Sequence, residues 1–566
     1  MKKMFLTASA ALILACGAYA QTTFKLNSGG YFNAGGVDAM AFNDYYPEGH
    51  QGGICVIMNG NRIATNGDIR FEPTPGQWQP VPRQVKREIV DDRITTYLAY
   101  PDSSRHMTGF NPMLYPDMQL TYSVTLEPRG NGLEVTVDLD QEIPERFLGK
   151  VGFNLEFFPG SLFGKPWIMD DKTGIFPQQA NAPLEVSESY TEHLGKFHPD
   201  GKSEVKDLDR LERGAYDPFT ADRIVAAPYA VGKVFTVLAD DPLGRLRITS
   251  ETGDMKLYDG RMNHNNGWFV LRSEIPAGAT KGAIKWYIEP NVVADWMYKP
   301  AVQESQGGYT PNQPKIAVIE TDSRDNGSGN VKVVKITPNG DKVVATVPAI
   351  AWNGKFLRYN YLRADFSDVK EPGVYKLVYG ESTSTMFRID ENVYDRGVWQ
   401  PVLEYFLPVQ MCHMRVNEKY RVWHDLCHED DAVMAPTDFN HIDGYTQGAS
   451  TLCDYKTGDR IPGMAVGGWH DAGDWDLRIE SQSVQAYLLA LEIENLGAYW
   501  DETSIDFANH VVEIHQPDGV NDFLQQVENG ALSIVAGWNA LGRLYRGVIC
   551  PTVRQYTLLG DAAAHT

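Results

Sequence analysis

The chain has 566 residues, 43% of them hydrophobic, so it is long enough for about three or four globular domains with sizeable cores. Its formal net charge of −22 argues against nucleic-acid binding, which needs a basic face, and suits an uncharged ligand. Six cysteines are too few for a disulfide scaffold in a chain of this length.

The amino-terminal residues have the pattern of a secretory signal peptide. Lys2-Lys3 precedes an apolar run over residues 4–15, which is too short to span a bilayer, and Ala18-Tyr19-Ala20 fits a cleavage site. A lipid anchor at Cys16 is the weaker alternative. We expect residues 1–20 to be removed and the protein to be secreted, periplasmic or at the cell surface, without a membrane span.

Residues 21–300 predict an all-β domain. Short alternating runs such as Leu133-Glu134-Val135-Thr136-Val137 recur, separated by turn residues such as Pro128-Arg129-Gly130-Asn131-Gly132. This pattern is typical of a β-sandwich. Scattered Trp and Tyr residues could stack on sugar rings, although filling of the core or rim is the alternative that we favour.

A second stretch of strand pattern follows a short linker. Residues 301–313 are polar and contain Gly307-Gly308, which predicts the linker. Residues 314–392 include a hairpin around Pro338-Asn339-Gly340-Asp341 and the turn Glu371-Pro372-Gly373. Their length and strand count predict an immunoglobulin-like sandwich.

From residue 394 onward the hydrophobic period changes from 2 to 3.6, which predicts helices. Gly497 is the expected stop of the second helix, and Pro408 should kink or end the first. The apolar stripes of the three helices are Trp399, Val402, Leu403 and Phe406; Val484, Tyr487, Leu488 and Leu491; and Phe523, Val527, Ala531 and Val535.

The most informative stretch is Gly467-Gly468-Trp469-His470-Asp471-Ala472-Gly473-Asp474-Trp475. Asp471 and Asp474 stand three residues apart before the second helix, which puts both carboxylates on one side. A water molecule held between them is polarised for attack on an unactivated bond. The alternative is a loop whose aspartates accept hydrogen bonds from backbone N–H groups before the helix.

A second group of residues has metal-binding character. Cys412 precedes the adjacent pair Cys427-His428, and zinc prefers ligands of these types. Adjacent Cys and His residues can both reach one ion where the backbone turns. The spacing is not that of a zinc finger, so two buried thiols and a surface histidine remain the alternative.

Three blocks of sequence, in this order, resemble glycoside hydrolase family 9, in its branch with an immunoglobulin-like domain before the catalytic domain. The first two are Tyr361-Leu362-Arg363-Ala364-Asp365-Phe366-Ser367 with Pro372-Gly373-Val374-Tyr375, and Gln410-Met411-Cys412 with residues 427–432. The third and most specific is residues 467–474. The resemblance covers roughly residues 312–566. It implies an (α/α)6 barrel that cleaves β-1,4-glucan linkages, in cellulose or a decorated glucan such as xyloglucan, with inversion.

The same resemblance implies roles for the two aspartates. Asp474 corresponds to the general base, and Asp471 to a residue that helps to hold the attacking water. An inverting hydrolase also needs a protonated carboxylic acid about 6.5–9.5 Å from the base, which the resemblance places beyond residue 566. We therefore expect the chain as printed to be a truncated hydrolase that is inactive alone.

The resemblance also implies a structural zinc, with Cys412, Cys427 and His428 as three of its ligands. No confident match is found for the fourth ligand. Asp476, His470 and His424 are the alternatives, and an empty site is a further one.

The expected chain is thus multidomain: an amino-terminal all-β sandwich, an immunoglobulin-like β-sandwich, and the first part of an all-α (α/α)6 barrel over residues 394–566. The leading hypothesis is a secreted endo-β-1,4-glucanase whose binding partner is a β-glucan. The alternative is a secreted, non-catalytic glycan-binding protein that acts through its β domains. Glycan binding by residues 21–310 alone would favour the alternative.

Overall fold

The computed structural model describes residues 23–42, 52–71, 82–100, 118–186, 224–262, 267–325, 327–354, 356, 359–429, 432–434, 439–440, 446–447, 453–456, 458–471 and 476–548. The chain divides into two compact units, which meet in the sequence between Trp296 and Met297. The predicted signal peptide, the alternative anchor Cys16 and the predicted base Asp474 lie outside the described residues.

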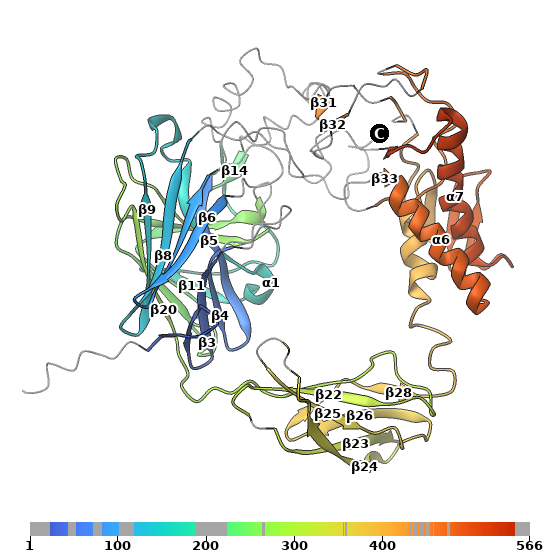
Figure 1. Ribbon diagram of the computed structural model, residues 1–566, viewed down its shortest axis with the longest axis horizontal. Helices are drawn as coiled ribbons and strands as arrows, with labels where there is room; N and C mark the ends of the chain where they lie inside the picture. Colours follow the sequence, from blue (N-terminus) through green and yellow to red (C-terminus); the bar gives the residue numbers. More distant parts are fainter. Residues whose placement is uncertain are drawn as a thin grey trace, which may run out of the picture. The chain divides into compact units, whose positions relative to one another are not determined.

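The first unit is built from two nine-stranded antiparallel sheets (Figure 1). In spatial order, the first sheet contains β1 (Lys25–Leu26), β2 (Phe32–Ala34), β3 (Val37–Phe42), β4 (Gly53–Met58), β5 (Asn61–Phe71), β10 (Val151–Phe157), β19 (Phe269–Glu274), β18 (Met255–Asp259) and β15 (Ala230–Gly232). The second contains β12 (Lys172–Ile175), β11 (Pro166–Met169), β16 (Val234–Val237), β17 (Leu246–Ser250), β20 (Ile284–Pro290), β9 (Gly132–Leu139), β8 (Thr121–Arg129), β7 (Arg93–Ala99) and β6 (Arg83–Val90). Short elements are β13 (Leu184–Val186), β14 (Ile224–Ala226), α1 (Pro159–Leu162), η2 (Glu145–Phe147) and η3 (Gly260–Met262).

Aromatic side chains join the two sheets of this unit. Phe153 on β10 meets the fully buried Trp286 on β20 edge-on, with ring centroids 5.0 Å apart. Every second residue of β9 is buried, as the alternation in the sequence predicts for a strand with one face in the core. The predicted β organisation of this region is therefore confirmed for the described residues.

In the second unit, residues 301–389 form an antiparallel β structure. The strands, in spatial order, are β21 (Ala301–Gln303), β22 (Ile316–Thr321), β25 (Asn360–Asp365), β24 (Gly340–Ala351), β23 (Gly329–Thr337), β26 (Gly373–Tyr379) and β27 (Ser382–Thr383), and β28 (Phe387–Ile389) also pairs with β26. The predicted hairpin is present, because Thr337 pairs with Gly340 across the turn. Residues 301–303, which the sequence places in a linker, pair with β22.

The residues after 394 combine helices with strands. The helices are η4 (Val402–Phe406, a π-helical turn), α5 (Leu407–Gln410), α6 (Ile479–Leu496) and α7 (Asp522–Leu541). The strands are β29 (Arg415–Glu418), β30 (Arg421–His424), β31 (Phe439–Asn440), β32 (Thr446–Gln447), β33 (Leu477–Arg478), β34 (Thr503–Asp506), β35 (Val511–Ile514) and β36 (Gly547–Val548).

The expectation of an all-α region is therefore wrong for the described residues, which contain no (α/α)6 barrel. A four-stranded sheet, in the order β30-β29-β35-β34, lies among the helices. It forms because short alternating segments bury Val416, Val512 and Ile514 on one side. None of the helices in the described part of the chain is both long and apolar enough to cross a membrane.

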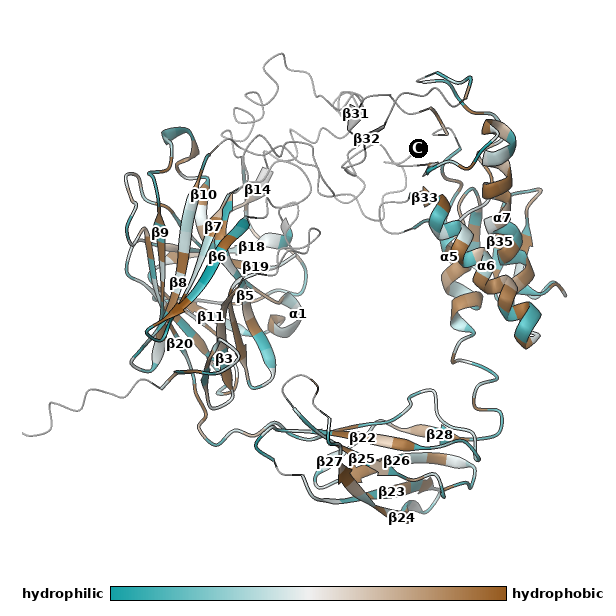
Figure 2. Cartoon of the chain, viewed as in Figure 1, coloured by the Kyte–Doolittle hydropathy of each residue, from teal (hydrophilic) through white to brown (hydrophobic). Residues whose placement is uncertain are grey.

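The two long helices pack side by side, but not through the predicted stripe of α6 (Figure 1). Val484, Tyr487 and Leu488 are each more than half exposed, whereas Gln482 and Leu489 are buried. Figure 2 shows hydrophobic residues distributed along both helices. The predicted stop is confirmed: α6 ends at Leu496 and is capped by Gly497, which has a left-handed φ of 61°.

Candidate metal centre and carboxylate loop

Two short segments, distant in sequence, run past each other and bring Cys412 and His470 together. The N–H of Cys412 donates to the carbonyl of Gly468 at 2.9 Å, and the N–H of His470 donates to the carbonyl of Gln410 at 2.9 Å. This antiparallel pairing places the end of α5 against the loop that precedes α6.

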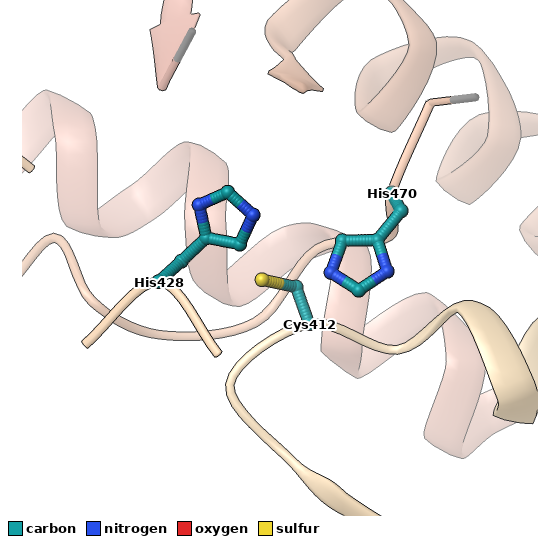
Figure 3. A group of neighbouring side chains, drawn as sticks. All are labelled: Cys412, His428 and His470. Atoms are coloured by element: carbon teal, nitrogen blue, oxygen red, sulfur yellow. The ribbon is translucent and has the colours of Figure 1, made fainter. Parts of the chain in front are cut away.

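Four buried side chains meet at this point, and we call them the Cys2His2 cluster: Cys412, Cys427, His428 and His470. Ligand atoms of Cys412, His428 and His470 all lie within 4.8 Å of one another (Figure 3). The Sγ of Cys427 lies 3.6 Å from that of Cys412 and 3.3 Å from Nε2 of His470. His428 has a left-handed φ of 54°, a sparsely populated conformation that marks a sharp turn of the backbone directly after Cys427.

Two of the four groups in the cluster favour the protonation states that a metal ion requires. The hydrogen bond with Cys412, and then that with His470, holds the pKa of the Cys427 thiol well below its usual value, against the effect of burial. Burial lowers the pKa of His470. A thiolate and a neutral imidazole are the forms that bind zinc.

Two of the separations in the cluster are close to those expected around one tetrahedral ion. Two thiolates about 2.3 Å from one tetrahedral zinc lie about 3.8 Å apart, and a thiolate and an imidazole nitrogen about 3.6 Å apart. The observed separations of 3.6 Å and 3.3 Å lie within 0.3 Å of those values. The donor set, two Cys and two His, is one that structural zinc sites use.

Of the three alternatives for the fourth ligand, the structure brings His470 to the cluster. The Nε2 of His424 lies 2.8 Å from the carbonyl oxygen of Val409. The buried carboxylate of Asp476 pairs with Arg478 at 2.8 Å. In the sequence, the only feature that pointed to His470 was its position directly before Asp471 in the carboxylate motif.

Asp471, one residue after the cluster, borders a groove. Its carboxylate accepts a hydrogen bond from Ser481 Oγ at 2.8 Å and lies 3.4 Å from Nε of Arg478, while one-third of the side chain stays exposed. The groove has a volume of about 730 Å³ and is otherwise lined mostly by apolar side chains of η4, α5, α6 and α7. A fixed but accessible carboxylate is suited to holding a water molecule.

Buried amide side chains of both long helices hold the loop that carries these residues. Gln482 of α6 accepts from the N–H of Trp469 at 2.8 Å and donates to its carbonyl at 2.9 Å. From α7, Gln526 accepts from the Trp469 indole at 2.7 Å, and Asn529 donates to the carbonyl of Gly468 at 2.9 Å. Sequence reasoning missed these three residues, because polar side chains are common along both helices and no local pattern marks these three as buried.

Replacement of Gly467 by a residue with a side chain should destabilise this loop. Gly467 has a φ of 66°, and a Cβ there would lie 2.4 Å from the carbonyl oxygen of Asn529. Gly467→Ala should therefore lower the free energy of unfolding by about 2–4 kcal/mol, because strain and a backbone clash add. Gly497→Ala is the matched control, with a φ of 61° and no atom within 4 Å of its Cβ. Urea unfolding followed by tryptophan fluorescence measures both, and equal losses would contradict the clash.

Comparison with known proteins gives one family match and distant relatives. The model of the cellulase N-terminal ig-like domain matches residues 298–384. Endoglucanase D of Acetivibrio thermocellus is 22% identical over 241 residues, which cover 42% of this chain and 33% of that protein. This chain thus spans about a third of the length of the curated relative that it matches.

Two solved structures are also similar. A metagenome-derived glycoside hydrolase family 9 endoglucanase is 22% identical, with a TM-score of 0.34 over 44% of this chain and 42% of its own. A zinc-binding triple mutant of the family 9 endoglucanase J30 is 23% identical, with a TM-score of 0.33 over 42% and 40%. The chain is a distant relative of a known endoglucanase and carries the cellulase N-terminal ig-like domain.

Proposed function

We propose that the protein is a glycoside hydrolase that cleaves β-1,4-glucan linkages with inversion of configuration. The observation that carries the proposal is the position of Asp471, which is held by Ser481 and Arg478 at the rim of an apolar groove. The distant relationship to Endoglucanase D supports the choice of a β-glucan as substrate.

In the proposed reaction, Asp474 removes a proton from a water molecule as its oxygen attacks the anomeric carbon. The glycosidic C–O bond breaks at the same carbon, and a carboxylic acid gives its proton to the leaving oxygen. Asp471 accepts a hydrogen bond from the same water and keeps it aimed, because Ser481 and Arg478 fix its carboxylate. We assign the acid to none of the described residues.

We further propose that the Cys2His2 cluster holds a structural zinc ion. When bound, the ion would supply four fixed bonds that tie together residues 410–412, 427–428 and 467–471. The separations of the sulfur and nitrogen atoms support this assignment. Its effect on catalysis would be to hold the carboxylate loop in place, since Asp471 directly follows His470.

Two other proposals rest mainly on the sequence. Residues 1–20 would direct secretion, and the mature chain would divide into domains at residues 21–300, 314–392 and 394–566, with a linker between the first two. The family match at residues 298–384 and the division of the chain at Trp296 support a boundary close to residue 300.

The test of the catalytic proposal is Asp474→Asn in the protein expressed from its complete reading frame. Loss of the base should lower kcat on a soluble β-1,4-glucan by about 10²–10⁴-fold with little change in glucan affinity. Asp395→Asn, at an exposed turn residue, is the control and should keep full activity. Reducing-sugar release measures turnover, and an undiminished rate in Asp474→Asn would reject the assignment.

A further inference from the structure

The immunoglobulin-like region carries two sets of contacting aromatic rings, most of them between the end of β24 and the start of β25. Together we call them the aromatic cluster and define it by Tyr298, Trp352, Phe356, Tyr359 and Tyr361. Tyr361 contacts Trp352 and Phe356 at centroid separations of 6.1 and 6.0 Å. Tyr298 stacks on Tyr359 at 4.4 Å. None of these residues belongs to the groove beside Asp471.

Part of the cluster is open to solvent. Trp352 is 43% exposed and Phe356 is 57% exposed, and the neighbouring Ile350 is also exposed. Large rings gathered at one place on a surface mark an interaction site more often than single exposed apolar residues do.

The rings are held in place by the chain around them. Gly354 lies under the indole, because a Cβ at that position would be 2.2 Å from an atom of the Trp352 ring. Phe356 and Tyr359 form a β-bridge, and the hydroxyl of Tyr298 donates to Glu320 at 2.8 Å. A ligand that docks on rings already fixed by the protein pays little ordering entropy.

The chemistry of the cluster selects an uncharged ligand with a flat apolar face. Its members are neutral rings, and the net charge of −22 on the chain repels nucleic acids and anionic lipid surfaces. The pyranose rings of a β-linked glucan are uncharged, present C–H groups on their faces and carry hydroxyl groups around their edges. Trp and Tyr side chains have the same division between an apolar face and a polar edge.

We propose that the aromatic cluster is a glucan-binding site, separate from the carboxylate loop, that holds a neutral β-glucan chain against Trp352 and Phe356. The choice of a β-glucan rests on the proposed function, whereas the requirement for a neutral, flat ligand rests on the cluster itself. The immunoglobulin-like region would then keep the protein on the polysaccharide, in addition to any structural role.

Affinity electrophoresis of the whole chain in gels that contain hydroxyethylcellulose tests the proposal. Trp352→Ala and Phe356→Ala should each weaken retardation by about tenfold in apparent affinity, and Trp352→Phe should restore part of it. Met386→Ala is the matched control, because Met386 is 62% exposed in the same region but has no ring, and its retardation should stay at the wild-type value.

Three outcomes would overturn the proposal: no retardation of the wild-type chain, unchanged retardation of both alanine variants, or variants that change oligomeric state instead of glucan affinity. The last would identify the cluster as a contact between copies of the chain. Circular dichroism of each variant shows whether it is folded. Because binding is measured without turnover, an absence of hydrolysis would count against the proposed activity and leave this result intact.

Discussion

Cys412→Ser and His470→Gln should each abolish stoichiometric zinc binding and lower the melting temperature of the region after residue 394 by about 10 °C. Both side chains are buried, and they lie on segments joined otherwise by a few backbone hydrogen bonds. A structural ion contributes its binding free energy to folding, since the complete set of ligands exists only in the folded chain. Removal of one ligand also leaves a buried thiolate or imidazole without a cation.

The measurement is metal content by plasma mass spectrometry, together with thermal unfolding before and after chelation. Cys453→Ser is the matched control, because Cys453 is a partly exposed thiol whose Sγ lies 4.0 Å from the carbonyl oxygen of Tyr455. It should keep one zinc per chain and the wild-type melting temperature. A wild-type protein that holds no zinc after purification with added metal, or melts unchanged after chelation, would refute the site.

Asp522→Asn should stabilise the protein above neutral pH. Asp522 begins α7, is fully buried and accepts a hydrogen bond from the N–H of Glu502 at 2.9 Å, while its other oxygen has no hydrogen-bond partner among the described residues. Burial raises the pKa of Asp522 to about 7, against the effect of backbone N–H groups, and Asp501 and Asp518 add to the rise. The folded chain therefore favours the neutral acid.

The sign of the pH dependence follows from that shift. The unfolded carboxyl ionises near pH 4 and the folded one near pH 7, so the unfolded state loses its proton first as the pH rises. The free energy of unfolding therefore falls between pH 4 and 7. Above pH 7 the raised pKa of Asp522 lowers it by its full amount, about 2–4 kcal/mol. Asn cannot ionise, so Asp522→Asn should gain about 2 kcal/mol at pH 8 and almost nothing at pH 4.

Urea unfolding at pH 4, 6 and 8 measures this difference between variant and wild type. Asp506→Asn is the control of opposite sign, because hydrogen bonds from the Asn509 side chain and backbone lower the pKa of this exposed carboxyl. That variant should be slightly less stable than wild type at pH 8. An Asp522→Asn protein that is less stable than wild type at pH 8 would show that the charged form is favoured in the fold.

Local sequence patterns were sufficient to predict those parts of the fold in which neighbouring residues decide the backbone conformation. The hairpin of β23 and β24 follows from alternation on both sides of Pro338-Asn339, because turn chemistry acts within four residues. The end of α6 follows from Gly497, which adopts the left-handed conformation without the cost of a Cβ.

The buried side of α6 could not be predicted in the same way. The period of 3.6 located the helix, but the stripe of Val484 and Leu488 is more than half exposed in the described structure. Gln482 is buried instead, because its amide satisfies the backbone of Trp469 in a loop that no helical pattern reveals. Hydrogen-bond partners distant in sequence thus outweighed hydrophobic periodicity.

The sequence by itself determined the β character of the first half, the immunoglobulin-like strands, the long helices and the types of residue at the candidate metal site and in the carboxylate loop, because periodicity, turn residues and ligand chemistry are local properties. The tertiary structure alone decided that His470, and neither Asp476 nor His424, completes the Cys2His2 cluster. That choice depends on the pairing of residues 410–412 with 468–470, which sets where each side chain points. Contacts between segments nearly sixty residues apart are a property of the folded chain, and no spacing along the sequence contains them.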